Sequence, residues 1–506
     1  MSLELNNIIA QLTGGSASPG GDAVLGGAAG MSNEMGQELL KALQATTYQT
    51  DVAQLTGGSA LTVQSLDTVM KTTIQENKHF TFFNKLSQTS ATNIVDEYIR
   101  QNNVGGFLGG STNTQMGVVR SAQGDYAREV GLVKFLMTLR QVGYILNIGK
   151  NVVEATAVEE RNGALQLMTD ANYLLYYGNA DTSPTQFDGI FNIIDKEVTA
   201  GNISSDHVYN MNGKPFNSIE PLSAIGVSVA NYGSWGRATD IFMPNSVQQD
   251  LNMGIDPAFR WLPEGNNTPM IGSHVEGIRL QSGVVRTNMD TFIHNESHPM
   301  VFPFEVNYAA IASANAGINP VSVTVDASVS DASSTFTTTR AGNYYYAVAS
   351  IDSTGAGMSQ VVKSSQTAIN SGKKAVLTIT ASAAGTESGY AVYRSRQNGT
   401  NATNDFRLIG YVKKAGATTT FTDLNLKIPG TVSVPVLNMD PGSDAIGWRQ
   451  YQPMTKIPLP FGVGGIPVIS FFQFLFGYLR VTKPKHHGYI ANVLPSSATW
   501  RPHSGE

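Results

Sequence analysis

Two histidine pairs in the sequence have a spacing that could bind a metal ion. His294 and His298 stand four residues apart with Glu296 between them, which is close to the spacing of zinc ligands on a helix. In the zinc-protease helix the glutamate directly follows the first histidine, whereas here it is displaced and a proline follows the second histidine. A polar loop is therefore favoured. His486 and His487 lie in KPKHHG, where we expect a solvated basic turn, so we predict no metal site.

Other signatures of catalysis are missing from the sequence. The chain has no cysteine, which excludes disulfides, thiolate metal sites and cysteine nucleophiles. It has no nucleophile-elbow motif and no phosphate-binding P-loop, and its carboxylates are too scattered to nominate an acid–base pair. Asp240, Asp250 and Asp256 lie in one stretch, where we expect them to cap and turn the backbone. We predict no catalytic centre, no cofactor and no enzymatic activity.

The composition indicates a chain that buries much of its surface against partners or covers it with small polar residues. Only 14% of the 506 residues are charged, against about 25% in ordinary soluble domains. The hydrophobic fraction of 41% excludes wholesale disorder, and the net charge of −5 argues against a dedicated nucleic-acid binder. The first residues contain neither a basic segment nor a long apolar core, so we expect no secretory signal.

One uncharged run, from Ile457 to Leu479, is long enough to span a membrane. It contains Pro458, Pro460 and Pro467 and several glycines, a composition more typical of buried extended chain than of a helix. We therefore predict strands here and no contact with a membrane.

The segments before residue 150 predict an arm followed by a two-stranded loop. The first sixty residues are rich in glycine, and the octapeptide AQLTGGSA occurs at 10–17 and again at 53–60. The repeat is either part of a low-complexity arm or a short segment that docks twice on equivalent surfaces. A helical pattern lies between the two copies at 33–45, and another follows them at 61–86. Residues 93–100 and 128–148 indicate two long strands around a glycine-rich tip.

The remaining segments predict an α+β chain with an all-β insertion. Residues 151–177 have helical spacing over about 39 Å and stop at Gly178, and an α+β texture continues to 317. From Ile318 to Val432, 31 of 115 residues are Ser or Thr, and short alternating runs indicate a β-sandwich. The mixed texture then returns. The predicted segments are 1–60, 61–150, 151–317, 318–432 and 433–506.

This order of segments resembles the major capsid proteins of tailed bacteriophages, the Hong Kong 97 shell fold. By that resemblance 1–60 is the N-terminal arm, 93–148 the extended loop, 151–177 the spine helix of the peripheral domain, and the lobe after Gly178 the axial domain. The insertion resembles immunoglobulin-like or fibronectin-type modules. Its run AGNYYYAVASIDSTGAGMSQVV, similar to late strands of such a module, precedes GYAVYRSRQ, similar to middle strands. Either the strand order is permuted or two partial sandwiches are present.

The resemblance implies a structural protein that assembles through hexamers and pentamers into an icosahedral head shell around double-stranded DNA. Its place would be the virion head, and the host cytoplasm during assembly. Implied partners are further copies of itself, portal and scaffold or decoration proteins, and DNA bound non-specifically, with a weak cell-surface contact through the insertion. The residues expected to contact neighbouring subunits are in the loop tip: Gly105, Gly106, Phe107, Gly109, Gly110 and Met116.

Three other functions are compatible with the sequence. An encapsulin shares the fold, although the arm, the length and the insertion favour a phage protein. A phage tail or surface attachment protein could bind host carbohydrate through the β-sandwich. A hydrolase with an accessory β-module is the third alternative, and the sequence offers no positive feature for it.

Overall fold

The computed structural model describes residues 80–107, 109–148, 154–232, 236–255, 275–293, 316–353, 358–461 and 467–503. The predicted arm, the predicted helix at 33–45, the His294–His298 pair and Asp256 lie outside these residues. Of the segment predicted helical at 61–86, the described part contains one short helix, α4 (Thr81–Lys85).

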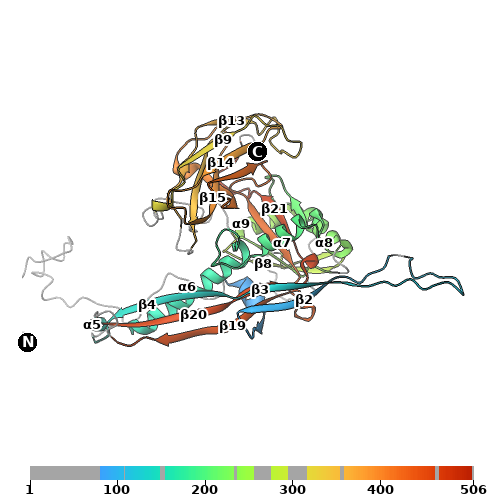
Figure 1. Ribbon diagram of the computed structural model, residues 1–506, viewed down its shortest axis with the longest axis horizontal. Helices are drawn as coiled ribbons and strands as arrows, with labels where there is room; N and C mark the ends of the chain where they lie inside the picture. Colours follow the sequence, from blue (N-terminus) through green and yellow to red (C-terminus); the bar gives the residue numbers. More distant parts are fainter. Residues whose placement is uncertain are drawn as a thin grey trace, which may run out of the picture. The chain divides into compact units, whose positions relative to one another are not determined.

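A four-stranded sheet brings together segments from both ends of the described chain (Figure 1). The described part of the uncharged run at 457–479 falls mainly on one of its strands and is extended there, as predicted. Along that strand Phe471, Gln473 and Leu475 are buried while Phe472 is exposed, so one face of the sheet is covered. Among the described helices none is long and apolar enough to cross a membrane. In spatial order the strands are β1 (Ser87–Ser90), β19 (Ile446–Pro458), β20 (Val468–Val481) and β4 (Lys134–Gly143).

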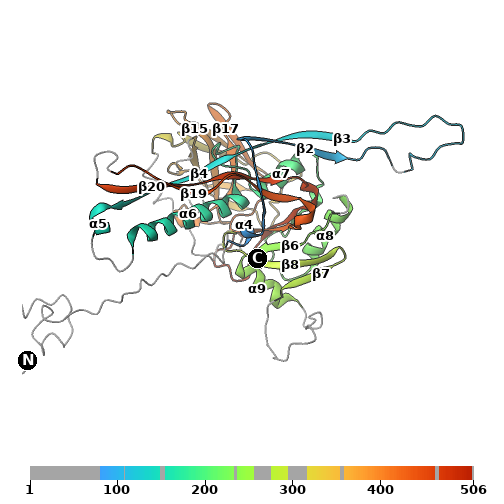
Figure 2. The same cartoon turned by 90° about the horizontal axis from the view of Figure 1, so that it is seen from below.

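The long helix α6 (Ala155–Tyr177) covers that face of the sheet (Figure 2). Arg140 of β4 donates hydrogen bonds to Glu159 at 3.2 Å and to Gln166 at 2.6 Å. Gln473 of β20 donates to a helix carbonyl at 2.9 Å. The helix ends at Gly178, as its sequence pattern predicts, and the described part of the predicted span is helical from residue 155 onwards.

A buried carboxylate joins α6 to the N-terminal part of the described chain. Asp290 accepts hydrogen bonds from Tyr176 at 2.8 Å, Thr81 at 2.9 Å and Asn172 at 3.3 Å. Burial raises the pKa of Asp290, and these hydrogen bonds oppose the rise. The side chain therefore fixes α4 and α6 against the turn that contains Asp290.

A six-stranded mixed sheet forms the second part of the body, by which we mean both sheets and their helices. Its strand order places β18, which follows the insertion, between β21 and β6. The strands in spatial order are β5 (Val208–Asn210), β21 (Gly488–Val493), β18 (Val432–Leu437), β6 (Asp240–Met243), β8 (Gly283–Met289) and β7 (Gly277–Leu280). The helices are α7 (Ile190–Thr199), α8 (Glu220–Tyr232), α9 (Asn245–Gly254) and the short η2 (Ser205–His207), η6 (Pro441–Ser443) and η8 (Pro484–His486).

The prediction of one long strand over 128–148 is wrong in two respects. The segment forms β3 (Asp125–Leu132) and β4, which belong to different sheets, and then the helix α5 (Tyr144–Ile148). Val133 lies between the two strands, is buried, and donates its N–H to the carbonyl of Ile94 at 2.9 Å. Alternation continues across Val133, so the pattern could not reveal that the strand changes partners there.

The insertion contains two sheets that share a hydrophobic core. One has the order β12-β11-β15-β16 and the other β17-β14-β9, with a separate β10-β13 pair. Val348 and Val392 from the first sheet and Val323 and Leu377 from the second lie in one buried cluster. Its classification as immunoglobulin-like remains a prediction. The elements are η4 (Ala316–Ile318), β9 (Ser322–Asp326), β10 (Gly342–Tyr344), β11 (Tyr346–Asp352), β12 (Val362–Lys363), β13 (Thr367–Ile369), β14 (Ala375–Thr380), β15 (Glu387–Ser395), η5 (Thr403–Asp405), β16 (Phe406–Lys413) and β17 (Thr418–Asp423).

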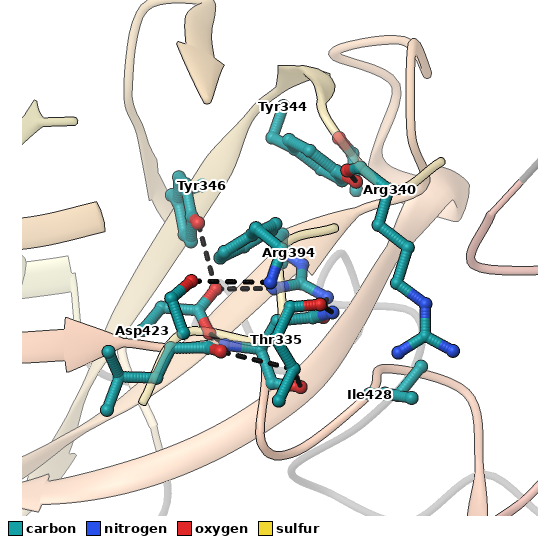
Figure 3. Close-up of polar contacts among 12 residues, drawn as sticks. Thr335, Arg340, Tyr344, Tyr346, Arg394, Asp423 and Ile428 are labelled. Carbon is teal, nitrogen blue, oxygen red and sulfur yellow. Dashed lines mark hydrogen bonds and ion pairs between the residues drawn. The ribbon is translucent and has the colours of Figure 1, made fainter. Parts of the chain in front are cut away.

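A fully buried arginine organises the polar end of this core (Figure 3). Arg394 pairs with Asp423 at 2.5 Å and donates to the side chain of Asn425 at 2.5 Å, while Tyr346 donates to the same carboxylate at 2.8 Å. The guanidinium also lies 5.2 Å from the ring centre of Tyr344. A buried charge is tolerated only when it is paired and hydrogen-bonded, as it is here.

Replacing Arg394 with methionine should destabilise the insertion by about 3–5 kcal/mol, because Asp423 would keep a buried charge without its partner. Hydrogen exchange of amides in β11 and β15 of the full chain measures this loss. The control Lys374→Met breaks the more exposed pair with Asp331 and should cost less than about 1 kcal/mol. Equal losses in the two variants would contradict the prediction.

Candidate functional site

The predicted two-stranded loop is an antiparallel hairpin of β2 (Val95–Asn103) and β3. Its base, by which we mean the paired strands, runs from the Val95–Leu132 pair to the Asn103–Asp125 pair. Residues 104–107 and 109–124 form the tip, and in both views no other described segment lies beside it (Figures 1 and 2). A two-stranded ribbon without further packing is at best marginally stable in water.

All six residues predicted for inter-subunit contact lie in this tip. Gly105, Gly106 and Gly109 have positive φ angles of 86°, 80° and 79°, a conformation that favours glycine. At Gly105 a Cβ would also lie 2.0 Å from the carbonyl oxygen of Gln123, on the returning side of the tip. The Phe107 ring packs over Gly110, where a Cβ would lie 2.8 Å from the ring. The glycines thus shape the turn, and their role in subunit contact stays a prediction.

The tip exposes several large apolar side chains among its polar residues. Met116 and Val118 are 97% and 91% exposed, and Val119, Val104 and Phe107 are exposed as well. The predicted contact residues were glycines, Phe107 and Met116, and they did not include Val104, Val118 and Val119. The position of these valines inside a polar, glycine-rich segment was a usable signal. Large apolar side chains gathered on one exposed segment mark an interaction site more often than isolated ones do.

The outward face of the base continues this apolar surface. Val95 and Ile99 of β2 and Val130 and Leu132 of β3 are exposed, and they alternate with side chains that point to the body. One exposed ion pair, between Arg128 and Glu97 at 3.4 Å, lies among them. Alternation along both strands therefore gives the hairpin one apolar face and one face directed to the body.

The face directed to the body is fixed by ion pairs. Asp96 accepts hydrogen bonds from Arg449 at 2.9 Å and Tyr478 at 2.6 Å, and Arg480 lies 3.9 Å away. Burial would raise the pKa of Asp96, but the hydrogen bonds from Arg449 and Tyr478 outweigh it and lower the pKa below its usual value. The strand β2 is thereby held against β19 and β20.

A second ion cluster lies further along the same strand. Arg100, which is almost fully buried, pairs with Glu197 of α7 at 2.8 Å and with Glu129 of β3 at 3.0 Å. Between the two clusters, the guanidinium of Arg480 lies 5.4 Å from the ring centre of Tyr98. The base is therefore attached to β19 and β20 through Asp96 and to α7 through Arg100. The tip has no such attachment among the described residues.

The prediction that KPKHHG forms a solvated turn is wrong. His487 is fully buried and accepts the N–H of Asn438 at 3.2 Å, and burial lowers its pKa to about 3. The turn packs against α7 and α8, which sequence spacing alone could not show. His207, on η2, is also buried, and burial lowers its pKa too.

The acidic residues also differ from expectation. Asp240 begins β6 instead of capping a loop, and it pairs with Lys85 at 2.7 Å and accepts from Asn288 at 2.9 Å. Asp250 does bind the backbone, accepting the N–H of Ser496 at 2.7 Å. Within the described ranges no group of three or more histidine or acidic side chains could hold a metal ion.

Comparisons with known proteins gave similarity in structure but not in sequence. No protein-family model matches the chain, and no curated protein is similar to it in sequence. The capsid of a native GTA particle is similar over 87% of this chain and 98% of its own, with 7% identity and a TM-score of 0.44. An encapsulin from Synechococcus elongatus is similar over 90% and 99%, with 10% identity and a TM-score of 0.34. A structure from Mycobacterium phage Adephagia is similar over 88% and 94%, with 7% identity and a TM-score of 0.39.

Replacing Asp96 with asparagine should loosen the base by about 2 kcal/mol, because charge-assisted hydrogen bonds are lost. Hydrogen exchange in β2 and β3 should then accelerate about thirty-fold. The depressed pKa means that the wild-type contribution is present above about pH 4 and disappears as pH falls through the folded-state pKa. The variant should lack that pH dependence.

The matched control is Glu97→Gln, which removes the exposed ion pair on the opposite face of the same strand. Its effect should stay below about 1 kcal/mol. If Glu97→Gln loosened the base as much as Asp96→Asn, the ion cluster would not be what fixes the hairpin.

Proposed function

We propose that this chain is a major capsid protein of a tailed phage, which assembles through hexamers and pentamers into an icosahedral shell around double-stranded DNA. The observation that carries the proposal is the hairpin: its base is fixed to the body by buried ion pairs, and its tip exposes several large apolar side chains. These ion pairs fix the direction of a surface that none of the chain's own described residues covers. A neighbouring subunit is the partner that such a surface fits.

Identical subunits are favoured as that partner by the composition of the chain. A contact in which one subunit's loop meets a different surface of the next is heterologous, and it closes into rings when the rotation closes. Subunits surrounded by copies lose much of their surface, and the cores of interfaces are depleted in charge. The charged fraction of 14% agrees with such surroundings.

The proposed role carries further partners and a location with it. A shell of this kind would be found in the virion head and would assemble in the host cytoplasm. Portal and scaffold or decoration proteins would contact it there. Packaged DNA would meet the wall non-specifically, and the net charge of −5 suits a wall that does not grip phosphate.

Electron microscopy of the purified full-length chain tests the proposal. Closed shells, or hexameric and pentameric rings, would support it. A protein that remains a monomer or a trimer at high concentration would overturn it, and a trimer that binds host polysaccharide would indicate a tail or surface attachment protein instead.

Trimming the tip should abolish shells without unfolding the subunit. Replacing residues 104–124 with an Asn-Gly turn ends the hairpin at its last strand pair and leaves both ion clusters in place. We expect soluble subunits with unchanged hydrogen exchange in β4 and α6 and no stable shells by electron microscopy. A same-length Gly/Ser replacement separates reach from side-chain contact, and it should fail too. Normal shells from either variant would contradict the role of the tip.

The insertion should project from the outer face of the shell and be dispensable for building it. All strands of the insertion pair with one another, so its removal breaks no strand pairing in the body. Its sequence carries a net charge of +4, which on the inner face would lie against packaged DNA. On the outside the charge would give a weak, salt-screened attraction to anionic cell-surface polymers.

The test replaces Ser322–Asp423 with a Gly/Ser linker and also removes residues 498–506, because Trp500 packs on the insertion. Particles should form with a complete floor and lack an outer protrusion in reconstructed images. Density lost from the inner face, or a complete failure to form shells, would refute this placement.

A further inference from the structure

The last described residues leave the body and pack on the insertion. We call residues Ala498–His503 the strap. Trp500 is buried, and its Nε1 donates a hydrogen bond to Asp405 of η5 at 3.2 Å. The guanidinium of Arg407 lies 4.9 Å from the centre of the indole ring. The strap therefore connects the body to η5. In sequence, η5 lies far from the strap and within the insertion, away from the two points where the insertion joins the body.

The next residues of the strap enter the polar end of the insertion. The carbonyl of Pro502 accepts the N–H of Gln397 at 2.9 Å, and the side chain of Gln397 donates to Thr339 and Ala341 carbonyls at 2.9 and 2.7 Å. His503 is 3% exposed. Its neighbours are Arg340, Tyr344 and the buried Arg394, so the strap ends beside the network of Figure 3.

The surroundings of the His503 ring show which of its two nitrogens carries the proton. Tyr344 donates its single hydroxyl hydrogen to the carbonyl of Arg340 at 2.5 Å, so the hydroxyl oxygen must accept from Nδ1 of His503, 3.4 Å away. The proton of a neutral ring therefore lies on Nδ1. Nε2 is buried and has no hydrogen-bond partner among the described residues. Protonating Nε2 would create a buried donor without an acceptor.

The charges near His503 oppose a second proton as well. Arg394, on β15, is paired with Asp423 of β17, which offsets only part of its positive charge. Arg340, on the turn before β10, donates to a carbonyl of the body, Asn212, at 2.6 Å and contributes another positive charge. Burial first, and then repulsion from Arg394 and Arg340, lower the pKa of His503 to about 3.

We propose that the strap fixes the insertion to the body at neutral pH and is released when His503 takes up a proton. In the attached state the imidazole is neutral, whereas in the detached state it is solvated and binds a proton readily. Other contacts of the insertion with the body, such as Arg340 with Asn212 and Ser388 with the carbonyl of Thr182, do not involve the strap. Acidification thus removes one of several attachments and leaves the insertion linked.

The sign and size of the effect follow from linkage. A histidine with a lowered pKa in the attached state favours attachment above its ordinary pKa of about 6.5, and this contribution is lost as pH falls. With an attached-state pKa of about 3, the ratio of detached to attached strap should rise about thirty-fold from pH 7.5 to pH 5. Most of this change lies below pH 6.5.

Hydrogen exchange of the C-terminal peptide of the full-length protein, corrected for intrinsic rates at each pH, tests the proposal. In the wild-type chain the strap should lose protection about thirty-fold between pH 7.5 and pH 5, while β21 remains protected. His503→Asn offers a neutral amide donor in place of Nδ1 and should make the strap's protection independent of pH in this range. His503→Lys should leave the strap unprotected throughout.

Trp500→Ala provides a control that does not depend on the histidine. It removes the indole contact, so the strap should be unprotected at pH 7.5 while the body strands keep their protection. Three results would overturn the proposal: a strap unprotected at pH 7.5 in the wild type, equal pH profiles in wild type and His503→Asn, or loss of protection in β21 together with the strap.

Discussion

Ion pairs under the base of the hairpin are the constraint on which the proposed assembly depends. Apolar contacts have little directional preference, so an apolar tip alone would meet a partner in many orientations. Asp96 and Arg100, which are mostly withdrawn from water, tolerate only the placement in which their partners surround them. Direction therefore comes from buried charge at the base, and the driving force for association comes from exposed apolar surface at the tip.

The insertion uses the same division of labour. Its two sheets are held together by an apolar core, while Arg394, Asp423 and Tyr346 permit one arrangement at the polar end. An apolar core alone tolerates repacking, whereas a buried charge network does not. The strap adds another polar contact that restricts the arrangement, because His503 fits beside this network only as a neutral ring.

The sequence predicted elements whose signals are local and missed contacts between distant segments. Helical spacing with Gly178 at its end located α6, and two predicted strands on either side of a glycine-rich tip located the hairpin. The change of partner at Val133 was invisible because alternation has the same period in either sheet. The anchor between Asp96 and Arg449 joins residues 353 positions apart, and the buried His487 accepts from Asn438, 49 positions away, so neither had a local signature.

The central place of β18 in the six-stranded sheet bears on the order in which the chain folds during synthesis. β6, β8 and β7 leave the ribosome first, but β18, which hydrogen-bonds to β6, follows only after the whole insertion. Every strand of the insertion finds its partners within the insertion, so this module can complete itself while the body sheet still has an open edge at β6. An unpaired edge of buried strand residues is prone to pairing with other chains. The rate at which the insertion is translated and folded therefore sets how long each nascent subunit carries that edge.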